Sequence, residues 1–151
     1  DPHPMYTHLF VPVDGSELSH RAMDGSIELA KQLGAKITGF VVEPDLPLTA
    51  ATSRTDGLMH QMKENDNKNE AHASALLGQF EKRAQAAGVE FRAHHVTAYI
   101  VDQAIMDEAD KSGCDMIVMV THGRNAIGEF IFGSHTKKII AKSKLPVLVL
   151  H

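Results

Sequence analysis

Short apolar runs recur along the whole chain, and polar segments separate them. Five of these runs predict strands, at residues 9–13, 37–42, 89–96, 116–120 and 147–150. Most of the runs are apolar at successive positions, which is typical of strands buried on both faces. The segments between them carry apolar residues at helical spacing. Strands that alternate with helices predict an α/β fold, an open twisted parallel sheet of five strands with helices on both faces in three layers.

Helical periodicity is clearest in the segments at about residues 19–33, 73–87 and 101–113. Gly34 and Gly88 follow the first two of these segments and are expected to end the helices. A fourth, shorter helix is expected after Gly133-Ser134, and it ends before Pro146.

The segment from residue 43 to residue 69 interrupts this rhythm. Prolines and small polar residues up to Gly57 predict a loop, and the polar residues 63–69 predict a frayed helix start. Loops of this length are uncommon in compact domains and are usually functional or flexible. A lid over a ligand pocket is one interpretation. We favour a plain connection, because none of its residues is directed at a ligand.

In parallel sheets of this kind a ligand binds outside the carboxyl ends of the strands, at the point where the strand order reverses. The first and fourth strands are followed by turns rich in Gly, Ser and Asp. We therefore expect a pocket between these two strands. Asp14 ends the first strand, where it can accept from ribose hydroxyls, hold a metal beside phosphates, or simply begin the turn.

The turn after the fourth strand is the candidate phosphate site. Nine residues separate His122-Gly123 from Gly133-Ser134. Glycines let backbone N–H groups approach a phosphate, and a helix start attracts negative charge. Ser134 is expected to cap the helix and to present its hydroxyl. On these residues alone, a phosphate cradle and two ordinary turn glycines are equally good interpretations, since the chain has neither a Walker loop nor a dinucleotide fingerprint.

Composition narrows the functional classes. The 151 residues predict one domain over residues 5–151, with Asp1 to Pro4 left out as a candidate cloning remnant. A net charge of −4 argues against nucleic acid as a partner, and no apolar run has the length of a membrane span. The single cysteine, Cys114, excludes an intrachain disulfide and indicates a reducing, cytoplasmic location.

The ten histidines raise the question of a metal site. His94 and His95 are neighbours on a strand, so their side chains point to opposite faces and cannot chelate together. His122 and His135 can meet at the pocket, but a third zinc ligand is missing, because Cys114 is expected at the other end of the fourth strand. No nucleophile elbow or catalytic-cysteine motif accompanies the serines and histidines.

Five segments, PVDGSELSHRA, FVVEP, DMIVMVTHGR, GSHTKKI and PVLVL, together resemble the universal stress protein family. The match runs in order from Tyr6 to the last residue. The resemblance implies a Rossmann-like fold of the adenine-nucleotide α-hydrolase type. Many members of that family bind ATP through Gly-x2-Gly-x9-Gly-Ser/Thr, and they are typically dimers paired through their last strands. They modulate stress survival rather than catalyse a known metabolic step.

The resemblance also implies a set of contacts. Adenine and ribose would meet residues of the first, second and fourth strands: Pro12, Val13, Asp14, Val41, Met119, Val120 and His122. The phosphates would be held by the glycine motif and the helix that follows it: Gly123, Gly133, Ser134, His135 and Thr136. Countercharge would come from four side chains: Arg124, His122, His135 and Lys137.

Val120 stands where the family motif begins with glycine. A valine adds bulk there, so we expect weakened rather than abolished binding. The resemblance therefore implies a dimeric stress-response regulatory protein that binds ATP or another adenine nucleotide without efficient turnover. Two alternatives are a nucleotide-free dimeric interaction module and a slow ATPase in which Asp14 holds Mg²⁺ near the phosphates.

Overall fold

The computed structural model describes residues 5–44, 56–123, 126–127, 129 and 132–151, with the backbone alone for residues 56–67 and 69. Its strands are β1 (His8–Pro12), β2 (Lys36–Pro44), β3 (Phe91–Ala98), β4 (Met116–Val120) and β5 (Val147–Leu150). Its helices are α1 (Glu17–Leu33), α2 (Asp56–Ala86), α3 (Val101–Lys111) and α4 (Ser134–Lys142).

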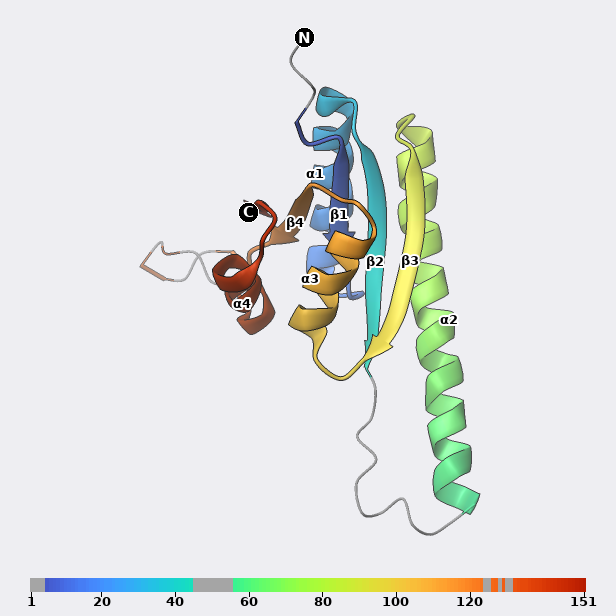
Figure 1. Cartoon of the computed structure of the whole chain (residues 1–151). Coiled ribbons are helices and arrows are strands. Elements are labelled where there is room, and N and C mark those ends of the chain that lie inside the picture. The colour runs from blue at the N-terminus through green and yellow to red at the C-terminus, as the bar shows by residue number, and fades with distance from the viewer. Residues whose placement is uncertain (1–4, 45–55, 124–125, 128, 130–131) are drawn as a thin grey trace.

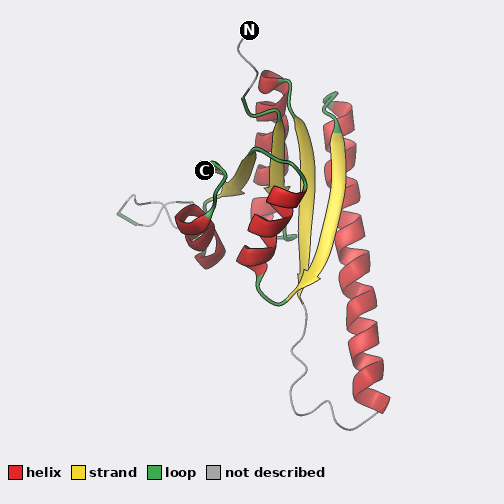
Figure 2. Ribbon diagram, in the orientation of Figure 1, coloured by secondary structure: helices red, strands yellow, loops and turns green. Residues whose placement is uncertain are grey.

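The five strands form one parallel sheet in the order β3-β2-β1-β4-β5. Helices α1 and α2 cover one face of the sheet, and α3 and α4 cover the other (Figures 1 and 2). The predicted three-layer α/β fold is therefore confirmed. The order reverses between β1 and β4, because the chain moves outward to β2 after β1 and to β5 after β4.

Two apolar clusters hold the layers together, one on each face of the sheet. The cluster under α1 and α2 contains Leu9, Val11, Ile37, Val41, Met23 and Phe80. The cluster under α3 and α4 contains Phe10, Phe40, Ile105, Ile117 and Ile139. Successive residues of β1 thus belong to opposite clusters, because side chains alternate along a strand. Burial on both faces explains why the strands are unbroken apolar runs.

Helix α1 packs its apolar stripe against the sheet and ends where the sequence predicts. Gly34 adopts φ +67°, a left-handed conformation that glycine takes without strain, and its N–H donates to the Ala30 carbonyl. Further back on the helix, Gly25 faces the edge of the sheet. A Cβ at Gly25 would come within 2.6 Å of Leu150 Cδ1 in β5.

Helix α2 differs from the prediction. It begins at Asp56 and runs for 31 residues, so the expected loop up to Gly57 and frayed start at 63–69 are wrong where the structure describes them. Gln, Met, Lys and Glu favour a helix without an apolar stripe, which explains why periodicity missed the start. The remainder of the expected loop, residues 45–55, lies outside the described residues. The helix extends past the carboxyl ends of the strands (Figure 1).

The third strand begins two residues later than predicted. Val89 donates its N–H to the Ala84 carbonyl and so completes the end of α2 before β3 starts. Among the helices that the structure describes, none combines the length and the apolar character that a membrane crossing requires.

The amino end of the sheet encloses a polar contact. His8 is 5% exposed, and its Nε2 lies 2.6 Å from Thr38 Oγ1 on β2. Burial lowers the pKa of His8 below its ordinary 6.5, and the nearby charge of Lys36 acts in the same direction. Cys114 is buried beside this contact, and burial raises the pKa of its thiol to about 11, so the thiol is unreactive.

We predict that Gly39→Ala destabilises the fold by roughly 1–3 kcal/mol. A Cβ at Gly39 would come within 2.6 Å of Phe91 Cζ and 2.9 Å of Phe80 Cδ2, in the middle of a packed ring pair. Gly78→Ala on α2 is the control, since a Cβ there meets nothing within 4 Å and is expected to stabilise by about 0.5–1 kcal/mol. Urea unfolding measures both; equal effects of the two alanines would contradict the packing argument.

We predict that the free energy of unfolding falls as the pH drops below 6.5. The pKa of His8 is lower in the folded protein than in the unfolded chain, so the unfolded chain binds more protons in this range. The stability advantage of wild type over His8→Gln should therefore be largest above pH 6.5 and shrink toward pH 5. Urea titrations of both proteins at several pH values test this, and a constant difference would contradict it.

Candidate functional site

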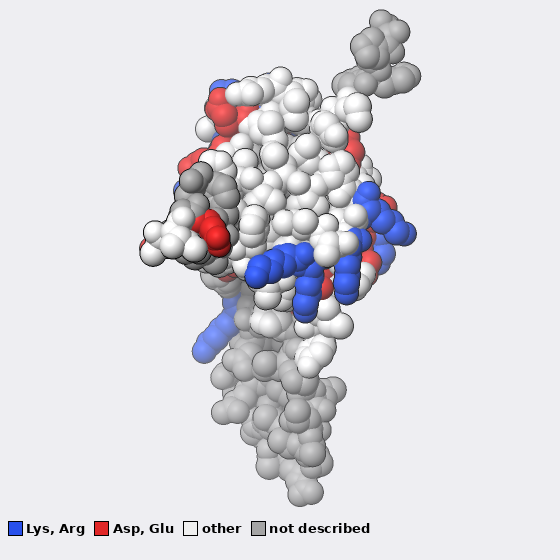
Figure 3. Space-filling model, turned by 90° about the vertical axis from the view of Figure 1, so that its left-hand side faces the viewer, with Lys and Arg blue, Asp and Glu red and all other residues white. Residues whose placement is uncertain are grey.

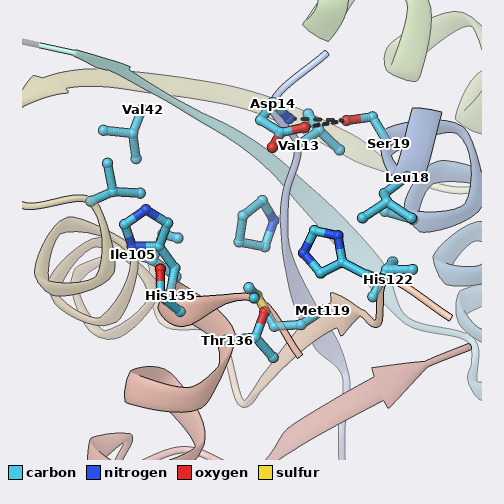
Figure 4. Close-up of a pocket in the computed structure, with 16 residues that line it drawn as sticks. Val13, Asp14, Leu18, Ser19, Val42, Ile105, Met119, His122, His135 and Thr136 are labelled. Atoms are coloured by element: carbon cyan, nitrogen blue, oxygen red, sulfur yellow. Dashed lines mark hydrogen bonds between the residues drawn. The ribbon is translucent and has the colours of Figure 1, made fainter. Parts of the chain in front are cut away.

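A cavity of about 310 Å³ lies at the carboxyl ends of β1 and β4, where the sequence predicts a pocket. Its walls come from three strands, three helices and the turns between them (Figure 4). The lining residues are Pro12, Val13, Asp14, Leu18, Ser19, Ala22, Val42, Val101, Ile105, Met119, Val120, His122, Gly133, Ser134, His135 and Thr136. The crevice thus gathers residues more than a hundred positions apart in the sequence.

The turn between β1 and α1 is fixed by reciprocal hydrogen bonds. Asp14 Oδ1 accepts from the Ser16 N–H at 3.0 Å and from Ser19 Oγ at 3.1 Å. Ser19 Oγ in turn accepts from the N–H groups of Asp14 and Gly15, both at 3.0 Å. Gly15 adopts φ +86°, which a side chain would strain. Asp14 therefore begins the turn, which was one of its predicted roles.

Asp14 is also an anionic acceptor at the cavity. Burial opposes its ionisation, but the hydrogen bonds from Ser16 and Ser19 outweigh burial, so the pKa of Asp14 lies below its ordinary value. Both bonds go to Oδ1. Oδ2 is consequently the atom suited to a ribose hydroxyl or a cation.

The start of α4 is the anion-binding part of the cavity. Gly133 is the N-cap and Ser134 is the first helical residue, so the expectation that Ser134 caps the helix is wrong. Among the residues that the structure describes, no side chain caps this helix. The first-turn N–H groups of Ser134, His135 and Thr136 have no partner within the helix, and the helix dipole is positive there. These donors suit a phosphate.

Two glycines serve this region for different reasons. Gly133 has an ordinary φ of −66°, but a Cβ there would lie 2.8 Å from His122 Nε2, so the glycine makes room for the imidazole. Gly123 adopts φ +97° and donates its N–H to Thr121 Oγ1 at 3.3 Å. It shapes the turn without lining the cavity.

Val120 fits its position in the fold. It belongs to β4 and pairs with Leu150 in β5, so its backbone is extended and requires no glycine. It is 9% exposed and lines the cavity. The valine therefore narrows the cavity without straining the chain.

Other predicted contacts are placed differently. Val41 does not line the cavity; it packs in the cluster under α1 and α2, and its neighbour Val42 lines the cavity instead. The alternation of side chains along β2 causes this exchange. Arg124 lies outside the described residues. The sequence also gave no sign of Val101 and Ile105, which reach the cavity from α3.

His94 and His95 point to opposite faces of the sheet, as the alternation of side chains along a strand predicts. His94 Nε2 lies 3.2 Å from Glu108 on α3, whereas His95 Nδ1 lies 2.6 Å from Glu43 on the opposite face of the sheet. Within the described part of the chain, no cluster of three or more His, Cys, Asp or Glu side chains could hold a metal ion. His122 and His135 both line the cavity, on opposite sides of it (Figure 4).

Comparison with known proteins agrees with this architecture. The model of the universal stress protein family matches residues 5–151. The chain belongs to this family. The universal stress protein YxiE of Bacillus subtilis is 25% identical over 150 residues, which cover 97% of this chain and 99% of YxiE.

Two solved structures of universal stress proteins share the fold. UspA from Lactobacillus plantarum has a TM-score of 0.79 at 22% identity, covering 99% of this chain and 100% of its own. A family member from Arabidopsis thaliana, solved with AMP bound, has a TM-score of 0.66 at 18% identity, covering 95% of this chain and 90% of its own. The expected family and its fold are therefore confirmed.

Proposed function

We propose that this universal stress protein binds an adenine nucleotide in the cavity between β1 and β4. The observation that carries the proposal is that the cavity has two chemically different ends. Val42, Val101 and Ile105 form an apolar end that suits a purine base, while Asp14 and the start of α4 form a polar end that suits ribose and phosphate. The Arabidopsis thaliana relative with AMP bound supports the same ligand class.

The size of the cavity favours a small adenine nucleotide. A volume of about 310 Å³ is at the lower end of ligand pockets, and Val120 occupies part of the space beside β4. AMP would place its base, ribose and one phosphate against the described residues. ATP would add two further phosphates, which Mg²⁺ would accompany, and the Asp14 carboxylate at the cavity is an anionic oxygen ligand that could hold this cation.

We propose regulation rather than efficient turnover. A general base works best with a pKa near the working pH, but the pKa of Asp14 is lowered. The Asp14 carboxylate is therefore better suited to binding a ligand than to removing a proton from it. Binding would instead select one conformation of the protein, with the nucleotide acting as a signal in a stress response in the cytoplasm.

We further propose that the protein is a homodimer paired through β5. This strand is at the edge of the sheet, and its four residues are all partly exposed. An apolar edge strand is prone to aggregate unless another strand covers it. The side of the molecule that carries α4 and the C-terminus has a broad uncharged area with charged side chains of both signs at its border, which suits burial against a second copy (Figure 3).

We predict that titration calorimetry detects AMP and ATP binding to nucleotide-stripped protein, and that Gly133→Ala weakens it at least about tenfold. The new Cβ would displace His122, whose Nε2 is 2.8 Å from its position, into the phosphate region. Val120→Gly should strengthen binding, more for ATP than for AMP, because it widens the cavity.

Gly78→Ala is the matched control, since it adds the same methyl group in open space on α2 and should leave affinity unchanged. Absence of heat and of a melting shift with wild type at millimolar nucleotide would contradict the proposal. The nucleotide-free interaction module would then be the better function, and the space that Val120 occupies in the cavity would explain why no nucleotide binds.

We predict that Val149→Pro converts the dimer to a monomer in light scattering at micromolar concentration. The carbonyls of Pro146 and Leu150 accept hydrogen bonds from the N–H groups of Ile117 and Thr121. Alternate residues of β5 therefore face β4, and Val149, between them in this alternation, directs its N–H to the outer edge of the sheet. Proline removes this donor without removing a bond to β4. Thr97→Pro is the control, because it removes an outward N–H on the other edge strand, β3. A monomeric wild type would overturn the pairing.

A further inference from the structure

A buried carboxylate on α3 stands behind one cavity histidine. The side chain of Asp102 is 9% exposed, and its Oδ1 lies 3.5 Å from His135 Nδ1 on α4. Within the described part of the chain, this carboxylate pairs with the side chain of His135. Asp102 does not line the cavity, whereas Val101 and Ile105 on the same helix do. The contact therefore joins α3 to α4 at the wall of the cavity.

The backbone of His135 belongs to the polar start of α4, but its side chain is directed toward the apolar end of the cavity (Figure 4). His135 is held against the first turn of α3, next to the residues that form the apolar wall. Its ring lies toward Val42 and Ile105, while His122 lies toward Leu18 on the other side of the cavity (Figure 4). A base that enters between the apolar walls would thus meet the imidazole of His135 with one of its polar edges.

The carboxylate determines what His135 offers to that edge. Carboxylates accept and do not donate, so a negative charge 3.5 Å from Nδ1 favours the form of the ring in which Nδ1 carries the hydrogen. In the neutral ring Nε2 is then an acceptor. An exocyclic amino group of a purine can donate to such an atom, whereas a carbonyl oxygen in the same place would face it lone pair to lone pair.

We propose that His135, positioned by Asp102, reads the base and makes the site prefer a 6-aminopurine over a 6-oxopurine nucleotide. This inference rests on the proposed nucleotide binding and adds the residue that discriminates among nucleotides. His135 is the specificity-determining side chain, and Asp102 is a positioning residue that acts through it. Discrimination between bases would depend on the His135 and Asp102 side chains. The backbone N–H groups of α4 would hold the phosphate of either nucleotide equally.

AMP and IMP are the probes, because they differ at position 6 of the purine and carry the same ribose phosphate. Calorimetry at pH 8, where imidazole is ordinarily neutral, should give wild type at least about tenfold tighter binding of AMP than of IMP. His135→Phe keeps an aromatic ring but removes both nitrogens, so the ratio of the two affinities should approach one through loss of AMP affinity.

Asp102→Asn tests the positioning role. The amide can donate as well as accept, so it no longer selects one form of the His135 ring, and the AMP preference should shrink. A merely structural role for Asp102 would lower both affinities equally and leave their ratio unchanged. His135→Phe leaves a buried carboxylate without its partner, so the double variant with Asp102→Asn is measured as well, with a melting curve for each protein, and it should give the ratio of His135→Phe.

His122→Phe is the matched control from the other side of the cavity. It should weaken AMP and IMP alike and preserve their ratio. Equal wild-type affinities for AMP and IMP, or a ratio that survives His135→Phe, would overturn this inference while leaving nucleotide binding intact. An unchanged ratio in Asp102→Asn would overturn the positioning role of Asp102. Binding of neither nucleotide to wild type would overturn the proposed function and this inference with it.

Discussion

The reversal of strand order between β1 and β4 is the constraint on which the rest of the molecule depends. Parallel strands need crossover helices, and these crossovers leave β1 and β4 in opposite directions along the sheet. The turns that follow the two strands must therefore part, and a crevice opens between them. The helices that line the cavity meet at this crevice because α1, α3 and α4 all begin at the carboxyl ends of the strands.

The crevice obtains its chemistry from how each helix begins. Helix α1 starts after a turn that the Asp14 and Ser19 side chains close on each other, which leaves a fixed negative charge. Helix α4 starts on a glycine that has no side chain to cap it, so its first N–H groups have no partner within the helix. Helix α3 contributes apolar side chains and a concealed carboxylate. One cavity thus combines an acceptor, a set of donors and an apolar wall, to which the strands contribute Val42, Met119 and Val120.

The sequence predicted the parts of this arrangement that local rules decide. The strands, the helix ends at Gly34 and the turn glycines follow from burial and backbone conformation, which are visible one residue at a time. A strand that is apolar on both faces does not reveal which of its residues face the cavity. Val41 was therefore predicted to line it, whereas its neighbour Val42 does. The role of Asp102 was invisible for another reason. An Asp in the first turn of a helix is ordinary, and only the packing of α3 on α4 gives it His135 as a neighbour.

Gly25, in the middle of α1, couples the turn at the start of this helix to the edge strand β5. The helix that supplies Ser19 to the cavity turn also leaves room at Gly25 for Leu150 of the edge strand. Six residues of helix separate the two, about 9 Å along one rigid rod. A side chain at position 25 would clash with Leu150, so either β5 or the helix that carries Ser19 would have to shift. The wall of the cavity and the border of the sheet are therefore not free to diverge independently in evolution.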